Sequence, residues 1–209
     1  MNRIIDQLAG HQRRRFERGT TILEFTIVAS LLFSMLFGII EFGLAFRDRL
    51  TISNATQNAA RVGAARGDDA DADFEILKAM ESSLSNLPNT GIQIVKFVDV
   101  FRATTAGLPA SGCPGAACNR YTYTPGGPGC DWNPCPDPDA GYSGWPWNPS
   151  SRDVALPDLE VLGVRTTFSH NWITGGLIPL PNVDCTGAPG TSCWVDIALF
   201  RQEPQVFEP

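Results

Sequence analysis

The stretch that decides the fold lies near the N-terminus, where residues 20–46 read TTILEFTIVASLLFSMLFGIIEFGLAF. Two charged side chains, Glu24 and Glu41, interrupt an otherwise uncharged segment, and residues 25–40 carry no charge at all. A helix of about 20 mostly apolar residues is long enough to cross a bilayer core of about 30 Å. The sequence therefore predicts a transmembrane helix over residues 20–46.

The flanking charges predict the orientation of this helix. Positively charged residues favour the cytoplasmic side of a membrane, and five arginines precede the span, namely Arg3, Arg13, Arg14, Arg15 and Arg18. The N-terminus is thus expected in the cytoplasm and everything after Phe46 outside it. A cleaved secretory signal is an alternative, but its apolar region is normally about 7–15 residues long. A plain single-span anchor is the better alternative, and neither explains a glutamate so early in an apolar segment.

Composition excludes one function class and indicates a compartment. The net charge is −6, whereas a general nucleic-acid binder needs a basic stripe that displaces counterions from phosphates. No nucleic-acid partner is therefore expected. All six cysteines come after residue 112, in a loop-rich region, and this pattern suggests disulfides formed in an oxidising compartment.

Three short motifs around the apolar segment carry a resemblance. Residues 18–25 read RGTTILEF, residues 38–43 read GIIEFG, and residues 58–66 read NAARVGAAR. With the arginine run before them, these motifs resemble the TadE-like family, the pseudopilins of the tight-adherence (Flp, type IVb) pilus assembly system. The resemblance covers roughly residues 13–66, about a quarter of the chain. The Cys-rich insertion described below departs from the short family pattern.

The resemblance implies how the N-terminus is processed and used. A prepilin peptidase is expected to cut between Gly19 and Thr20 on the cytoplasmic face, which would remove a leader of residues 1–19. Glu24, followed by the aromatic Phe25, would then pair with the N-terminal amine of a neighbouring subunit. An unpaired carboxylate in apolar surroundings costs several kcal/mol, so pairing favours one packed position. The alternative is that Glu24 reaches the headgroup region, while Glu41 is expected to mark the outer end of the span.

The same resemblance implies the function: a minor pilin or pseudopilin in tight-adherence pilus assembly, held in the bacterial inner membrane by a single span. Its implied partners are the prepilin peptidase, other pilins and pseudopilins, pilus assembly components and the lipid bilayer. The alternative is a membrane-tethered extracytoplasmic binding module that never enters a pilus.

A helical stalk is expected over residues 47–90. Small residues recur along it at three- and four-residue intervals, at Ala55, Ala59, Val62 and Ala65 or Arg66. Gly67 is expected to end this helix and Asp71 to cap a second one. The second helix shows an apolar face made of Phe74, Leu77, Met80, Leu84 and Leu87.

The remainder, residues 91–209, is predicted to form an extracytoplasmic α+β domain. Residues 92–101, 159–169 and 194–201 are rich in β-branched and aromatic side chains and are expected to be strands. Together they predict a small antiparallel sheet packed against the long helix. Between the first two of these strands, residues 103–157 carry ten prolines and eight glycines, so this loop insertion is expected to contain no regular element of ordinary length.

The cysteines are candidates for disulfides and form three close pairs, Cys113/Cys118, Cys130/Cys135 and Cys185/Cys193. Six cysteines permit fifteen connectivities, and neighbour pairing is favoured because each pair closes a short loop. A zinc site at Cys113, Cys118, Cys130 and Cys135 is the alternative, although an extracytoplasmic location favours oxidation.

Aromatic residues are concentrated in the insertion, at Tyr121, Tyr123, Trp132, Tyr142, Trp145 and Trp147. They could form a surface that binds a partner, or pack the insertion onto the sheet, and the second interpretation is favoured because the loop has few other apolar groups.

No feature of the sequence points to an enzyme. His11 and His170 are the two histidines, and no Gly-x-Ser-x-Gly turn accompanies either. No phosphate-binding or dinucleotide-binding motif is present. Neither a catalytic residue, a cofactor nor a metal is expected.

Overall fold

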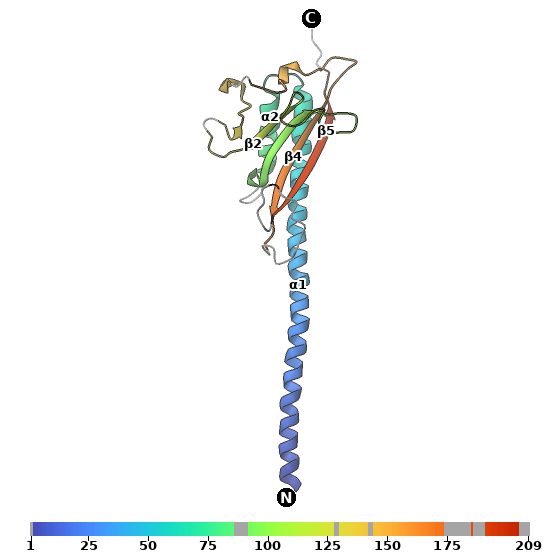
Figure 1. The fold of residues 1–209 in the computed structure, drawn as a ribbon, viewed down its shortest axis with the longest axis vertical. Helices are drawn as coiled ribbons and strands as arrows, with labels where there is room; N and C mark the ends of the chain where they lie inside the picture. The colour runs from blue at the N-terminus through green and yellow to red at the C-terminus, as the bar shows by residue number, and fades with distance from the viewer. Residues whose placement is uncertain are drawn as a thin grey trace. The chain divides into compact units, whose positions relative to one another are not determined.

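The computed structural model describes residues 2–85, 92–127, 130–141, 144–173, 185 and 191–204, without the side chains of residues 2–20, 140, 191 and 192. The chain divides into two compact units, Met1–Leu44 and Ala45–Pro209. The elements, in order, are α1 (Asn2–Arg66), α2 (Ala72–Leu84), η1 (Ile92–Ile94), β1 (Val95–Arg102), β2 (Cys118–Tyr123), β3 (Trp132–Asn133), η2 (Pro138–Ala140), η3 (Pro149–Ser151), β4 (Val161–Asn171) and β5 (Thr191–Arg201) (Figure 1).

The first helix ends where the sequence predicts. Gly67 adopts a left-handed backbone with φ of 58°, and its N–H donates to the carbonyl of Gly63 at 3.1 Å. This arrangement satisfies a carbonyl that the helix end would otherwise leave unpaired. Asp71 takes the cap position before α2, but its side chain makes no cap hydrogen bond. The predicted N-cap position of Asp71 is therefore confirmed, without a side-chain hydrogen bond.

The strands form one antiparallel sheet in the order β3-β2-β1-β4-β5. The α+β fold with a long N-terminal helix and a small antiparallel sheet is confirmed. The three expected strands are present with shifted bounds, and a short 3-10 helix, η1, takes the start of the first.

The prediction that residues 103–157 hold no regular element is wrong. β2 spans six residues of this insertion and pairs with β1 from Phe97↔Thr122 to Phe101↔Cys118, and the two-residue β3 pairs with β2. The high average content of proline and glycine conceals the run at residues 117–124, ACNRYTYT, which contains neither residue. Alternating polar and aromatic side chains there suit a half-buried strand.

The core lies between one face of the sheet and the two helices, α2 and the part of α1 in the second unit. It is made by Ile52, Ala55, Ala59 and Ala60 of α1, by Ile76, Leu77, Met80 and Leu84 of α2, and by strand residues such as Val98, Val100, Leu162, Val164 and Phe168. A buried hydrogen bond of 2.8 Å between the hydroxyls of Thr56 and Thr166 also joins α1 to β4. Small residues on α1 allow the helix to approach the sheet closely.

The exact stripe of small residues differs from the predicted one. Ala55 and Ala59 are buried as expected, but Ala65 is exposed, and Ala60 and Ala64 are buried in its place. At Gly63 an added Cβ would lie 2.5 Å from side-chain atoms of Ile76 and Leu162, so this close approach requires glycine. On α2, Phe74 is only half-buried, whereas Asp73 is fully buried. Leu87 lies outside the described residues.

Candidate functional site

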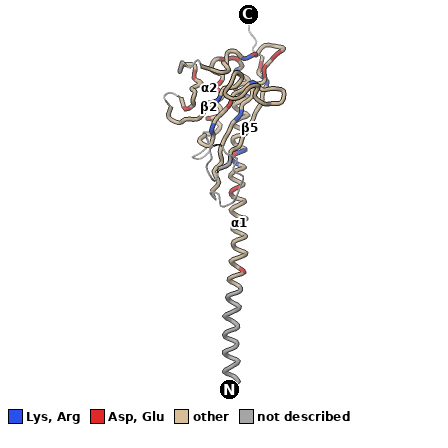
Figure 2. The backbone as a smooth tube through the Cα atoms, viewed as in Figure 1, with Lys and Arg blue, Asp and Glu red and all other residues tan. Residues whose placement is uncertain are grey.

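The first unit exposes an almost continuous apolar surface. Large apolar side chains from Ile22 to Phe42 are exposed by between 45% at Ile40 and 72% at Phe25. A soluble monomer rarely exposes apolar surface of this extent. In the part of the chain that the structure describes, α1 is the one helix long and apolar enough to cross a membrane. Between Thr21 and Leu44 the charged residues are Glu24 and Glu41, and the rest of this part of the tube is drawn as uncharged in Figure 2. The unit therefore has the properties of a membrane anchor.

The residues predicted to act in processing and assembly all lie on α1. Gly19 and Thr20 belong to the helix but their side chains are outside the described part, so the processing site stays a prediction. Glu24 and Phe25 are exposed in the apolar region. Thr20 and Glu24 are four residues apart, about 6 Å along the helix axis. Glu41 differs from Glu24 because it is buried, with only 3% of its surface exposed.

A buried carboxylate holds the insertion onto the second unit. Asp73 of α2 is 1% exposed and accepts hydrogen bonds from the Asn119 amide, at 2.8 Å, and from the Tyr121 hydroxyl, both on β2. Its other oxygen accepts from the guanidinium of Arg152, which follows η3. One side chain thus joins α2, β2 and the far end of the insertion.

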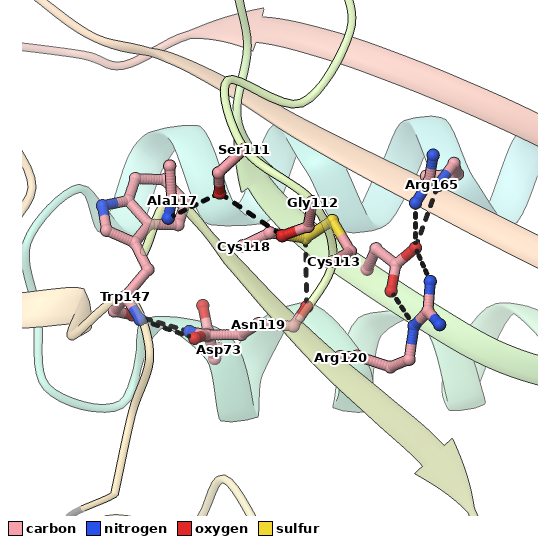
Figure 3. The surroundings of a disulfide bond; sticks show 11 residues. Asp73, Ser111, Gly112, Cys113, Ala117, Cys118, Asn119, Arg120, Trp147 and Arg165 are labelled. Carbon is pink, nitrogen blue, oxygen red and sulfur yellow. Dashed lines mark hydrogen bonds and ion pairs between the residues drawn. A yellow bond between two sulfur atoms is a disulfide. The ribbon is translucent and has the colours of Figure 1, made fainter. Parts of the chain in front are cut away.

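The partners of Asp73 are themselves fixed by the insertion. Asn119 exchanges hydrogen bonds with the backbone of Trp147, donating to its carbonyl at 2.6 Å and accepting from its N–H at 2.9 Å (Figure 3). The Arg152 guanidinium stacks over the Trp147 ring, 4.3 Å from its centroid. We call these five residues, Asp73, Asn119, Tyr121, Trp147 and Arg152, the Asp73 cluster.

The charge balance of the Asp73 cluster matters because it is removed from water. Burial raises the pKa of Tyr121 well above its usual value, and the negative charge of the neighbouring Asp73 raises it further. The Tyr121 hydroxyl therefore stays protonated and donates its hydrogen bond to Asp73. The Arg152 side chain is fully buried, and its Nε and Nη1 atoms have no hydrogen-bond partner. A buried charge without its counter-ion costs several kcal/mol, so Asp73 and Arg152 depend on each other.

The opposite face of the sheet carries a second ionic cluster. Asp99 of β1 is fully buried and lies between Arg120 of β2 and Arg165 of β4, which are its register neighbours. Arg120 donates to both Asp99 oxygens, at 2.6 and 3.0 Å, and Arg165 donates from two nitrogens at 2.9 and 2.6 Å. The pair of arginines joins three strands through one carboxylate.

A disulfide lies beside this cluster. Cys113 is bonded to Cys118, and ligand atoms of both lie within 4.8 Å of Asp99, a grouping that could hold a metal ion. However, the sulfurs are bonded to each other and the carboxylate already binds two guanidinium groups (Figure 3). This arrangement is structural: the disulfide closes the loop that leads into β2.

The other disulfides are also between neighbours, with Cα–Cα distances of 5.8 Å for Cys130–Cys135 and 5.1 Å for Cys185–Cys193. All three pairs are those that the sequence analysis favoured. In particular, the four cysteines of the zinc alternative form two disulfides and do not present four thiolates.

The Cys130–Cys135 loop contacts α2 through a hydrogen bond and β2 through an aromatic pair. The indole N–H of Trp132 donates to Glu81, and Trp132 packs edge-to-face on Tyr123 with ring centroids 5.3 Å apart. Burial, opposed by this hydrogen bond, raises the pKa of Glu81, and nearby Asp131 raises it further. A pocket of about 300 Å³ opens beside these residues.

The aromatics of the insertion therefore pack inward. Tyr121, Trp132 and Trp147 are buried in the core, and Tyr123 and Trp145 are partly buried against it. Tyr142 lies outside the described residues. The favoured interpretation, that these side chains hold the insertion to the sheet, agrees with this packing.

His170 has a structural environment. It is 5% exposed, its Nδ1 lies 2.7 Å from the Asp48 carboxylate, and its ring stacks on Trp194 with centroids 5.8 Å apart. Trp172 packs edge-on against the same ring, at 4.8 Å. These contacts join the end of β4 to α1.

Sequence reasoning missed the two buried carboxylates. Asp73 belongs to an otherwise apolar part of the second helix, and Asp99 lies within an apolar strand. A charged residue at such a position indicates that it is buried with an oppositely charged partner. The partners Arg120, Arg152 and Arg165 lie 21 to 79 residues away in sequence, so nothing local indicates them.

Comparison with known family models gives a match in the N-terminal part of the chain. No curated protein and no solved structure matches the chain. Residues 19–61 match the family model described as TadE-like protein, so the segment that carries the apolar helix is TadE-like, as its motifs predict.

Proposed function

We propose that this protein is a minor pilin or pseudopilin that takes part in assembling a tight-adherence pilus, and that it is not itself an enzyme. The observation that carries the proposal is the match of residues 19–61 to the TadE-like family. The matched segment contains both the Gly19–Thr20 junction and the exposed apolar part of α1. The family gives the pilus context, and the role within it is our inference.

The proposed mechanism starts with cleavage by a prepilin peptidase after Gly19. Cleavage frees an ammonium group at Thr20, one helical turn before Glu24. In a row of packed subunits, the Glu24 carboxylate of one copy binds the ammonium of its neighbour. Because a single charge in apolar surroundings costs several kcal/mol, helices whose charges are mismatched in height are disfavoured. The charge pair thereby sets the stagger between adjacent helices.

The second unit is proposed to lie outside the cytoplasm, where its three disulfides are stable. The Asp73 cluster and the disulfides fix the insertion onto the sheet. An insertion held in this way presents the same surface before and after it binds other pilus components. Binding is then not weakened by the free-energy cost of ordering a flexible loop. The five arginines before the span support the proposed orientation in the inner membrane, with a cytoplasmic N-terminus.

The N-terminus of the membrane-isolated protein tests the first step. Mass spectrometry should find Thr20 as the first residue in cells with an active prepilin peptidase, and Met1 or its processed form in cells without one. An intact leader in both strains would contradict the proposal and favour the membrane-tethered binding module.

Glu24 tests the second step. In the native host, Glu24→Ala should reduce piliation strongly while the protein stays in the membrane and is still cleaved. Glu203→Ala is the matched control, because its exposed side chain lies on the second unit. Equal piliation in the two variants would contradict the pairing mechanism.

A further inference from the structure

The end of the sheet that is tied to Asp48 of α1 carries an unusual set of side chains. In the second unit, β4 runs antiparallel to α1 (Figure 1), and its end is tied to the helix by the 2.7 Å contact between His170 and Asp48. Beyond His170 come Asn171, Trp172 and Ile173. Asp48 itself is only two residues beyond Phe46, where the apolar segment ends.

Contacts along α1 give the height of this end. Gly63 lies against Leu162, Thr56 bonds to Thr166, and Asp48 bonds to His170. From Leu162 to His170 the strand advances eight residues, about 26 Å at 3.3 Å each. From Gly63 to Asp48 the helix covers fifteen residues, about 22 Å at 1.5 Å each. At this ratio, each strand residue advances about two residues down the helix. Asn171, the last residue of β4, is then level with about Phe46, and Trp172 follows it directly.

The side chains at this height have the chemistry of a membrane interface. We call Phe46, Arg47, Arg49, Leu50, Trp172 and Ile173 the basal surface. Phe46 is 66% exposed, Leu50 58% and Ile173 69%, and both arginines are exposed. Tryptophan and arginine are favoured where apolar chains meet charged headgroups. The polar headgroup layer is about 5–7 Å thick on each side of the bilayer core. Phe46 and Leu50 are four residues apart, about 6 Å along the helix axis, so they span a distance equal to this layer.

The basal surface is also held in place. The Trp172 ring packs on His170 at 4.8 Å and lies 6.3 Å from Trp194, which contacts Phe168 of the core. Asp48 and Phe46 point to different sides of α1, because residues two apart are separated by about 200° around a helix. The basal surface thus surrounds the helix and does not form a patch on one side of it.

We infer that the basal surface rests on the lipid bilayer, with Trp172 and Ile173 entering the headgroup region and Arg47 and Arg49 contacting lipid phosphates. The inference rests on the membrane anchoring proposed above. The second unit would then stand directly on the membrane before assembly and not at the end of a free stalk. Extraction from the bilayer would have to break this contact.

Depth-dependent fluorescence quenching tests the inference. The full chain is reconstituted into phosphatidylcholine–phosphatidylglycerol vesicles, with or without bromine atoms on the acyl chains near the headgroups. A new tryptophan is introduced by Ile173→Trp or, as the matched control, by Leu156→Trp. The two native side chains are 69% and 70% exposed, so either replacement is sterically tolerated. Leu156 precedes β4 and lies at the other end of the strand from Ile173.

Brominated lipid should reduce the emission added by Ile173→Trp by about twofold or more, because an aromatic ring on this surface settles at headgroup level. The emission added by Leu156→Trp should not change. Trp172→Phe gives an independent measurement, since it should remove most of the quenching that the wild-type protein shows. Unquenched emission from Ile173→Trp, in protein that alkaline washing does not release, would overturn the inference and leave the anchor intact. Release by alkaline washing would instead overturn the membrane anchoring and, with it, the proposed function.

Discussion

Replacing Asp73 by asparagine removes the charge that neutralises Arg152 while keeping the shape of the side chain. The two side chains are 1% and 0% exposed, so Arg152 cannot recover hydration without unfolding part of the insertion. Removing one partner of a buried ion pair typically costs about 3–5 kcal/mol. We expect Asp73→Asn to lower the free energy of unfolding by this amount.

The control is an ion pair of the same kind in contact with water. Arg102 and Glu160 are 3.1 Å apart, and their side chains are 49% and 15% exposed, so water reaches the guanidinium of this pair. Exposed pairs contribute about 0–1 kcal/mol, so Glu160→Gln should have a small effect. Both variants change a carboxylate to an amide in an ion pair with an arginine, and the Arg102–Glu160 pair lies just outside the two ends of the insertion.

The assay is urea unfolding of the detergent-solubilised full chain without reductant, followed by tryptophan fluorescence. Trp147 reports on the cluster directly, because the Arg152 guanidinium lies 4.3 Å from its ring. The urea dependence should keep its slope while the midpoint falls. Adding Arg152→Met to Asp73→Asn should restore much of the loss, because no unpaired charge then remains. A loss of less than about 1 kcal/mol for Asp73→Asn, equal to that of Glu160→Gln, would refute the reasoning.

Three further changes test other parts of the second unit. Gly163→Ala should destabilise the protein by about 1–3 kcal/mol in urea unfolding, because an added Cβ would lie 2.4 Å from the Phe101 ring. The control is Gly112→Ala, which should leave the stability unchanged because an added Cβ at Gly112 meets no atom within 4 Å. Glu81→Gln should be more stable than wild type at pH 7. The raised pKa of Glu81 means that the folded state binds the proton more tightly than the unfolded state, so the wild-type protein loses stability as the pH rises. The difference in melting temperature should vanish below pH 4.5, the ordinary pKa of a glutamate, and a difference that stays constant with pH would contradict this cause. Replacing both Cys185 and Cys193 by serine should lower the free energy of unfolding by about 2–3 kcal/mol, because the unfolded chain is no longer constrained by the disulfide. The measurement is again urea unfolding, and an unchanged midpoint would show that the disulfide does not stabilise the fold.

The sequence was most informative where the physical signal is local. The apolar helix needs no distant partner to be recognised, because a mostly apolar run of bilayer length is typical of a membrane span. The end of α1 at Gly67 is equally local, since only the backbone of the last turn is involved. Disulfides between cysteines five or eight positions apart belong to the same class.

Prediction failed where composition was averaged over a long segment. The proline and glycine content of residues 103–157 concealed β2, which forms because β1 offers it a free edge. A strand of six residues is stable only with such a neighbour. Its position in the sheet could not be read from its own residues.

By itself, the sequence determined the candidate membrane span, the α+β class, the TadE-like segment and the pairing of nearby cysteines. Tertiary structure alone decided that Asp73 and Asp99 are buried, that Arg152 reaches across 79 residues to the first of them, and that His170 ties the end of β4 to Asp48. The physical reason is that a charged side chain is stable in water or beside an opposite charge. Only the folded chain determines which of the two surrounds it.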